Sequence, residues 1–151
     1  MLTIDKTAGI TVDAFSPSDY AAAATLWVEA LGNGFDPEFD TAERITGYLR
    51  RNPGLSSAAR VGEALIGTVL CGHDGRRGSL YHLAVHRDLR RRGVARQVVE
   101  RSVGELRKIG IHSGFCFTLS ENSVSQRALE SVGFEYAPTV QYRYKGFGKI
   151  D

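Results

Sequence analysis

The segment of residues 79–109 constrains the fold most, because it predicts a strand, a glycine turn and a helix in direct succession. Residues 80–86 are mostly apolar, which is typical of a central strand covered on both faces. After Gly93, the apolar residues recur at helical spacing: Val94, Val98, Val99, Val103, Leu106 and Ile109. Glycine lets the backbone approach a ligand, and the first N–H groups of a helix have no partner within it. We therefore expect residues 90–95 to bind an anion.

The turn carries the motif Arg-x-x-Gly-x-Ala, formed by Arg90, Gly93 and Ala95, directly after a strand that ends in LAVH. In this context the motif resembles the acyl-CoA pyrophosphate loop of the GNAT superfamily of N-acetyltransferases. Two other phosphate-binding patterns, GxGxxG and GxxxxGK[ST], do not occur in the chain. The alternative interpretation is a solvated basic turn before an ordinary surface helix.

A second stretch supports the resemblance. Asn122 or Ser123 can cap a short helix that Gly133 can end. The superfamily has an asparagine-started helix ending in Gly-Phe, which Asn122, Ala128 and the pair Gly133-Phe134 match. The stretch GTVLCGHDGRRG, which leads into the phosphate loop, is similar to the same stretch in a group of small bacterial GNAT proteins.

Composition limits the classes of protein to consider. A chain of 151 residues with a net charge of +2 fits one domain, and much of its arginine is concentrated in one turn, so we expect no nucleic-acid partner. Cys71 and Cys116 lie in apolar runs without disulfide or zinc spacing, which favours free thiols in a reducing cytoplasm. The N-terminus has no signal-peptide pattern, and no apolar run approaches the roughly 18 residues of a membrane span, so we expect no membrane partner.

Local patterns predict the remaining elements. Strands are expected at residues 9–15, 55–61, 64–71, 80–86, 112–119 and 140–144, and helices at 17–31, 41–51, 94–109 and 123–132. The resemblance implies an α/β (α+β) fold with a mixed, mostly antiparallel central sheet of six to seven strands, flanked by about four helices. It also implies a single domain of residues 1–151. The alternating last strand suggests a homodimer.

The resemblance implies where acetyl-CoA would bind. The backbone of Leu83, Ala84 and Val85 would pair with the pantetheine arm, and Asn122 would lie near that arm. The pyrophosphate would contact the turn, whose residues are Arg90, Arg91, Arg92, Gly93, Val94 and Ala95. The loop between the first two helices would form the wall for the acceptor amine, with Phe35, Asp36 and Glu38 as candidate contacts. A solvated loop with aromatic anchors is the alternative for these residues.

The groups that would move protons depart from the family pattern. The tyrosine that many members use as a general acid corresponds to Leu129, which cannot donate a proton. Strand alternation puts Tyr81 on one face and His82 on the other, and Tyr81 is the best polar candidate for a catalytic role. His82 is either a core histidine with satisfied hydrogen bonds, which we favour, or a functional group. No histidine has metal-ligand spacing such as HExxH, so we expect no metal.

Three functions follow from these patterns. The first is transfer of acetyl from acetyl-CoA to a primary amine of a small molecule or a protein, by direct attack. The second is a catalytically weak module that binds or senses acyl-CoA, which Leu129 favours. The third, binding of nucleic acid by the arginine turn, lacks any accompanying helix-turn-helix or stacking-aromatic motif.

Overall fold

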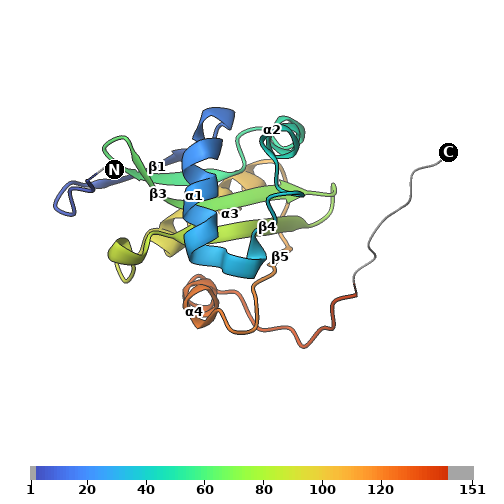
Figure 1. Ribbon diagram of the computed structural model, residues 1–151. Helices are drawn as coiled ribbons and strands as arrows, with labels where there is room; N and C mark the ends of the chain where they lie inside the picture. Colours follow the sequence, from blue (N-terminus) through green and yellow to red (C-terminus); the bar gives the residue numbers. More distant parts are fainter. Residues whose placement is uncertain (1–2, 143–151) are drawn as a thin grey trace.

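The computed structural model describes residues 3–142 of the chain. This part forms one five-stranded sheet in the order β1-β2-β3-β4-β5 with four α-helices (Figure 1). The strands are β1 (Ile10–Ala14), β2 (Ser57–Val61), β3 (Ala64–His73), β4 (Gly78–Val85) and β5 (Gly114–Cys116). The helices are α1 (Tyr20–Leu31), α2 (Ala42–Arg51), α3 (Val94–Lys108) and α4 (Ser123–Ser131), with 3-10 turns η1 (Pro17–Asp19), η2 (Gly32–Gly34) and η3 (Arg87–Leu89).

The sheet is mixed and mostly antiparallel, as the sequence predicts. Strands β1 to β4 pair antiparallel, and β5 lies parallel to β4 after the crossover through α3. The prediction of six to seven strands is wrong for the described residues, which form five. The strand expected at 112–119 shrinks to β5.

The strand expected at 140–144 is not formed by the three of its residues that the structure describes. Residues 140–142 are not in a strand, and residues 143 and 144 lie outside the described part. Val140 and Tyr142 are 78% and 91% exposed, so their alternation does not mark a buried face of the sheet. The homodimer expected from this strand stays a prediction.

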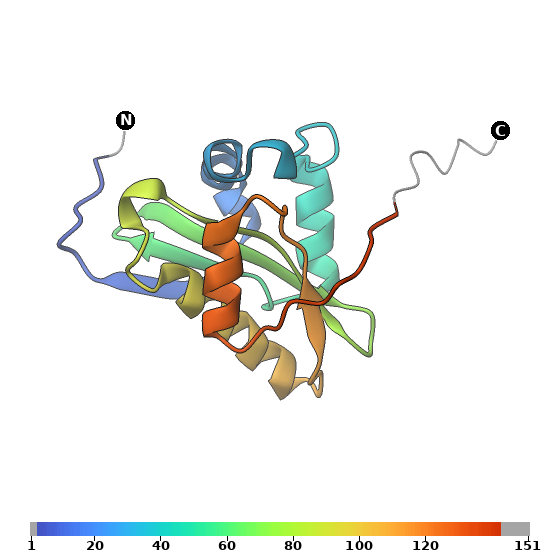
Figure 2. The same ribbon diagram turned by 90° about the horizontal axis from the view of Figure 1, so that it is seen from below.

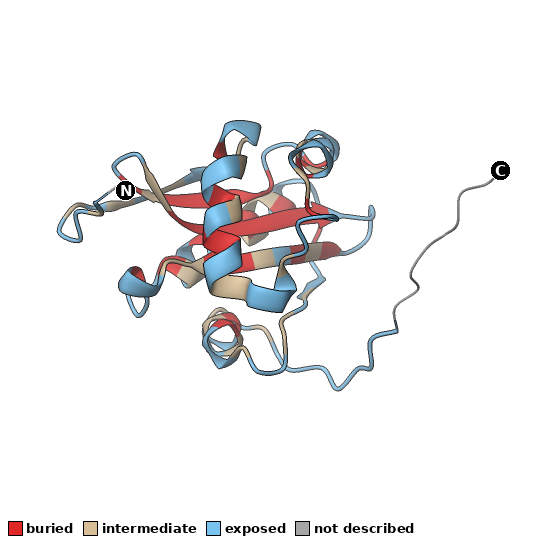
Figure 3. Cartoon of the chain, viewed as in Figure 1, coloured by how far each residue is buried: buried red, intermediate tan, exposed pale blue. Residues whose placement is uncertain are grey.

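Helices cover both faces of the sheet (Figures 1 and 2). On one face, α1 and α2 enclose an apolar core around Trp27 with Leu70 of β3 and Ala84 of β4. On the other face, α3 and α4 pack over a larger core around Val98, which includes Leu129. The central strands are accordingly buried along most of their length (Figure 3).

Short-range interactions fix where the helices begin. The Ser16 backbone N–H donates to Oδ2 of Asp19 at 2.8 Å, which closes the turn before α1. Oγ1 of Thr41 accepts from the N–H of Arg44 at the start of α2. No helix within residues 3–142 is long and apolar enough to cross a membrane.

The first turn of α3 sits directly on β3. A Cβ added at Gly67 would lie 2.6 Å from Cγ1 of Val94, so only glycine allows this approach. The contact positions the start of α3 relative to the end of β4.

Candidate active site

Strand β4 separates from β5 partway along its length. The two strands pair only from Gly78 to Leu80, opposite Gly114 to Cys116. Farther along, Ala84 and Val85 pair with β3 alone. The other edge of residues 83–85 therefore offers backbone N–H and C=O groups that no described strand takes up. An extended ligand with amide groups can pair with such an edge.

The arginine turn leads from β4 into α3. Arg91 and Gly93 have φ angles of 64° and 75°, in the left-handed region that favours glycine. The N–H of Gln97 donates to the carbonyl of Gly93, so the N–H groups of the first three α3 residues have no acceptor within the helix. The nearest atom to an added Gly93 Cβ is Nε2 of Gln97, at 4.0 Å. The backbone of this turn is thus open to an approaching anion.

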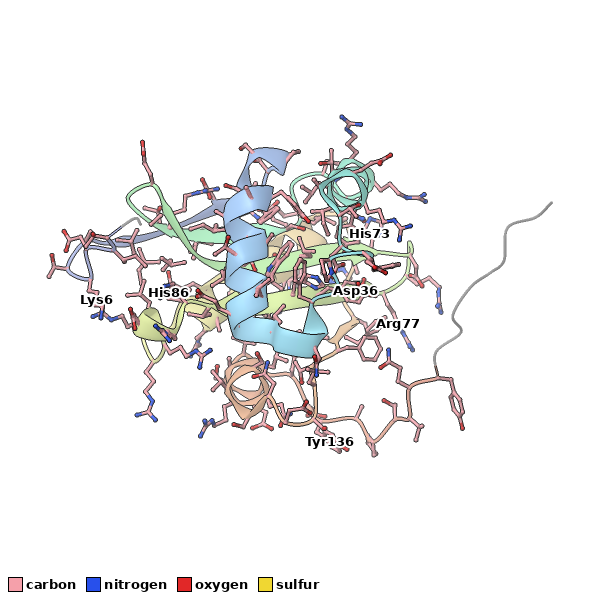
Figure 4. All side chains as sticks on the ribbon, in the orientation of Figure 1. Lys6, Asp36, His73, Arg77, His86 and Tyr136 are labelled. Carbon is pink, nitrogen blue, oxygen red and sulfur yellow. The ribbon has the colours of Figure 1, made fainter. Side chains whose placement is uncertain are left out.

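The three arginines of the turn are exposed, but they do not share one role. Nη1 of Arg92 donates to the backbone carbonyl of Lys6 at 2.6 Å and ties the N-terminal segment to the turn. Figure 4 shows Lys6 and His86 at this same end of the sheet. Arg90 instead lines a hollow between the turn and α4.

This hollow brings together six of the residues predicted to bind the cofactor: Leu83, Ala84, Val85, Arg90, Ala95 and Asn122. Oδ1 of Asn122 caps α4 by accepting from the N–H of Ser125 at 3.1 Å. A second hollow of about 390 Å³ adjoins the first, sharing Ala30, Val85 and Arg90 with it. Val94, in contrast, is 1% exposed and belongs to the core.

The loop before α2 holds the residues predicted to contact the acceptor. Oδ1 of Asp36 accepts from the N–H of Glu38 at 3.0 Å and from that of Phe39 at 3.4 Å, so this oxygen stabilises the loop itself. Glu38 is exposed, and the ring of Phe35 packs 5.7 Å from Trp27. In Figure 4, Asp36 lies on the side of α1 toward α2, toward the opposite end of the sheet from His86.

The prediction that Tyr81 and His82 face opposite sides of the sheet is wrong. The β3–β4 register shifts between Thr68 and Leu70, and His82 has a φ angle of 54°. This bulge breaks the alternation and turns the His82 ring toward α1. Its centroid lies 4.7 Å from that of Trp27, while the Tyr81 ring packs against Tyr48 of α2 on the same face.

His82 also has an acidic partner that the sequence patterns missed. Its Nε2 lies 2.9 Å from Oδ2 of Asp40, a hydrogen-bond distance, although the ring N–H does not point straight at that oxygen. Burial raises the pKa of Asp40, but the contact with His82 and the hydrogen bond from the Asp36 N–H together outweigh it, so the pKa lies below its ordinary value. Asp40 precedes the helix cap Thr41, and in the sequence it resembles an ordinary loop residue before a helix.

Other candidate groups are inert by their surroundings. Leu129 is 7% exposed and packs in the core under α3. Burial raises the pKa of both Cys71 and Cys116 to about 12, which disfavours the reactive thiolates.

Comparisons with known proteins identify the family and the fold of the chain. A profile of the acetyltransferase (GNAT) family matches residues 20–134. An acetyltransferase of Photorhabdus laumondii is 37% identical over 89 residues, which are 58% of this chain and 59% of that protein. The match thus spans less than two thirds of this bacterial relative.

Solved structures share the fold at lower identity. The PaiA N-acetyltransferase from Thermoplasma acidophilum in complex with coenzyme A has a TM-score of 0.76 at 16% identity, covering 87% of this chain and 93% of that chain. The enzyme AAC(6')-Iy, in complex with a bisubstrate analogue built from CoA and monomethyl-acetylneamine, has a TM-score of 0.72 at 18% identity, covering 92% and 99%. Because the family profile extends from the start of α1 to the end of α4, the chain belongs to the GNAT family of acetyltransferases.

Proposed function

We propose that this protein, as one domain of residues 1–151, transfers the acetyl group of acetyl-CoA to a primary amine of a small molecule or a protein. The observation that best supports the proposal is that the free edge of β4 and the open turn before α3 border the same hollow. The edge of β4 offers hydrogen bonds to amide groups, and the turn before α3 offers backbone N–H groups to phosphate. Acetyl-CoA has both kinds of group in one molecule.

In this proposal the pyrophosphate binds to the N–H groups of residues 91–95, with Arg90, Arg91 and Arg92 supplying positive charge. The pantetheine arm pairs with the backbone of residues 83–85, and the side-chain amide of Asn122 faces it from α4. Two solved structures of the same fold contain CoA or a CoA analogue, which supports this cosubstrate. The chemistry needs no metal.

The acceptor amine enters from the side of α1 and α2. Phe35, Asp36 and Glu38 form its wall, and Tyr81, which is 37% exposed, is a polar contact on the same face. Direct attack requires a neutral amine beside the thioester carbonyl, without a covalent intermediate on the enzyme. The two free thiols have raised pKa values, which fits that route.

The second candidate function is an acyl-CoA-binding or sensing module with weak catalysis. The buried Leu129 favours it, because a leucine side chain cannot donate a proton to the leaving thiolate. A thiolate is a tolerable leaving group, however, so loss of this acid does not exclude turnover. Binding of acetyl-CoA without turnover across a broad panel of amines would support the second function. We place the protein in the cytoplasm, without nucleic-acid or membrane partners.

Calorimetric titration of acetyl-CoA tests the cofactor site. The wild type should bind, and Gly93→Trp should not, because the indole would cover the backbone that the pyrophosphate approaches. Gly110→Trp is the matched control: Gly110 also has a positive φ, of 84°, and open space around it, but it lies at the far end of α3. Absence of binding in a folded wild type would contradict both candidate functions.

A further inference from the structure

The pair formed by His82 and Asp40 is an unusual feature for a sheet face. The two side chains are only 13% and 10% exposed, and Nε2 lies 2.9 Å from Oδ2. Burial of ionisable groups costs free energy unless each has a partner. The other ring nitrogen, Nδ1, makes no hydrogen bond with any residue in the described part of the chain. One ring nitrogen thus faces the Asp40 carboxylate at hydrogen-bond distance, although its N–H is not aligned with Oδ2, and the other is available.

The backbone of His82 is held in a conformation that a histidine rarely adopts. Its φ angle of 54° places it in the left-handed region, at the β4 bulge. Its carbonyl accepts from Oγ1 of Thr68 at 2.9 Å, and that oxygen accepts from Nε1 of Trp27 at 2.9 Å. Trp27 and Phe35 lie edge-on to the imidazole, with centroids 4.7 and 6.4 Å away. These contacts fix both the position and the plane of the ring.

Asp40 is held with similar precision from the loop side. Its Oδ2 accepts from the N–H of Asp36 at 3.2 Å, and its backbone carbonyl accepts from the hydroxyl of Tyr20 at 2.6 Å. A carboxylate on one nitrogen of a neutral imidazole favours the tautomer with its proton on that nitrogen. The lone pair is then left on Nδ1, which can accept a proton.

The place of the pair relative to the hollow suggests what it does. His82 immediately precedes Leu83, the first of the β4 residues that line the hollow, and it follows the point where β5 leaves β4. Trp27 lies one turn of α1 before Ala30, which lines the hollow as well. The pair therefore lies between the acceptor loop and the free edge of β4.

We propose that His82 is the catalytic base of this site and that Asp40 is its positioning residue; this inference rests on the proposed acetyl transfer. Nδ1 takes one proton from the acceptor ammonium, and the neutral amine attacks the thioester carbonyl. The C–N bond forms, the C–S bond breaks, and the sulfur leaves with the bonding electrons. The second amine proton passes through water to the thiolate, and the first is released from His82 to solvent. Acetyl-CoA and an ammonium ion thus give amide, free thiol and one proton.

Two small amines distinguish a base from a structural residue. Propylamine is an ammonium ion at pH 7, whereas 2,2,2-trifluoroethylamine is already neutral and needs no base to become a nucleophile. With acetyl-CoA saturating, His82→Gln should lower kcat/KM for propylamine by roughly 10²- to 10⁴-fold and that for trifluoroethylamine much less. Asp40→Asn should show the same selectivity with a smaller loss. His112→Gln, a change at an exposed histidine, is the control and should match the wild type.

Equal losses with both amines would overturn the assignment, since a structural residue affects both reactions alike. Acetyl-CoA binding without transfer to either amine or to any member of a broad amine panel in the wild type would overturn it too, and would favour the sensing function. Calorimetry on each variant shows whether acetyl-CoA still binds.

Nitrogen NMR tests the pair without any acceptor. The chain has four histidines, so His82→Gln identifies the His82 signals directly. In neutral His82, the proton should be on Nε2, and Asp40→Asn should reduce this preference. A proton on Nδ1 would overturn the inference even if acetyl transfer occurs. Failure of the wild-type protein to bind acetyl-CoA would instead overturn the proposed function. The NMR result would still show which nitrogen of His82 carries the proton.

Discussion

At the scale of single residues, Thr68 links the core to the candidate site. Its side chain is fully buried in β3, where Oγ1 accepts from Nε1 of Trp27 and donates to the carbonyl of His82. The β4 bulge leaves that carbonyl without a regular ladder partner. One hydroxyl therefore satisfies two buried groups that belong to different elements.

Replacing Thr68 by valine should reveal this role. Thr68→Val keeps the shape of the side chain but leaves an indole N–H and a carbonyl buried without partners. We expect the free energy of unfolding to fall by about 1–3 kcal/mol, measured by urea denaturation. Thr25→Val, on the exposed side of α1, should change it by less than about 0.5 kcal/mol. Similar values for the two variants would show that the buried hydroxyl does not link these groups.

At the scale of elements, regular periodicity made most of the fold predictable. Helix α3 and the turn before it follow from a glycine and a helical apolar pattern, and both lie where the sequence predicts them. The β4 bulge was not predictable, because a histidine with positive φ carries no signal comparable to glycine. His82 was therefore assigned to the wrong face. The Asp40 contact depends on that bulge and on tertiary packing of the loop, so no local pattern indicates it.

The contact between β3 and α3 gives a prediction at this scale. In Gly67→Ala, the added methyl group would meet Cγ1 of Val94 at 2.6 Å and Cβ of Ala59 at 3.3 Å. The start of α3 should shift outward, lowering the free energy of unfolding by about 1–3 kcal/mol and weakening acetyl-CoA binding.

A double variant separates this clash from other effects. Val94→Ala removes the methyl group that is struck, so Gly67→Ala should cost less in the Val94→Ala background than in the wild type. Gly104→Ala, within α3 and with open space around it, should instead stabilise the protein by up to about 1 kcal/mol. Simple additivity of Gly67→Ala and Val94→Ala would contradict the proposed contact.

At the scale of the whole molecule, charge sets how the protein responds to acid. The chain has 19 Lys and Arg against 17 Asp and Glu, so protonating carboxylates leaves a large net positive charge. Self-repulsion then destabilises the folded state of the wild type and of any variant alike. A specific contribution appears only as a difference in pH dependence between variants. Asp19 is suited to this test, because its side chain is 9% exposed and contacts Nη1 of Arg60 at 2.7 Å.

Asp19 joins α1 to the sheet, and its loss should change the acid response. Burial raises the pKa of Asp19, but hydrogen bonds from Arg60 and Ser16 outweigh this and lower it below 3.8. A carboxyl group with a lowered pKa stabilises the fold above its unfolded pKa, and this stabilisation disappears as the pH falls through the folded pKa.

Asp19→Asn should therefore lower the free energy of unfolding by roughly 1–3 kcal/mol at pH 7. Between pH 5 and about pH 2 it should lose less stability than the wild type, because the variant has no such group to protonate. Urea denaturation across this range measures both quantities, with Glu63→Gln in the exposed β2–β3 turn as the control. Parallel pH curves for wild type and Asp19→Asn would mean that Asp19 is not stabilised as a carboxylate in the folded protein.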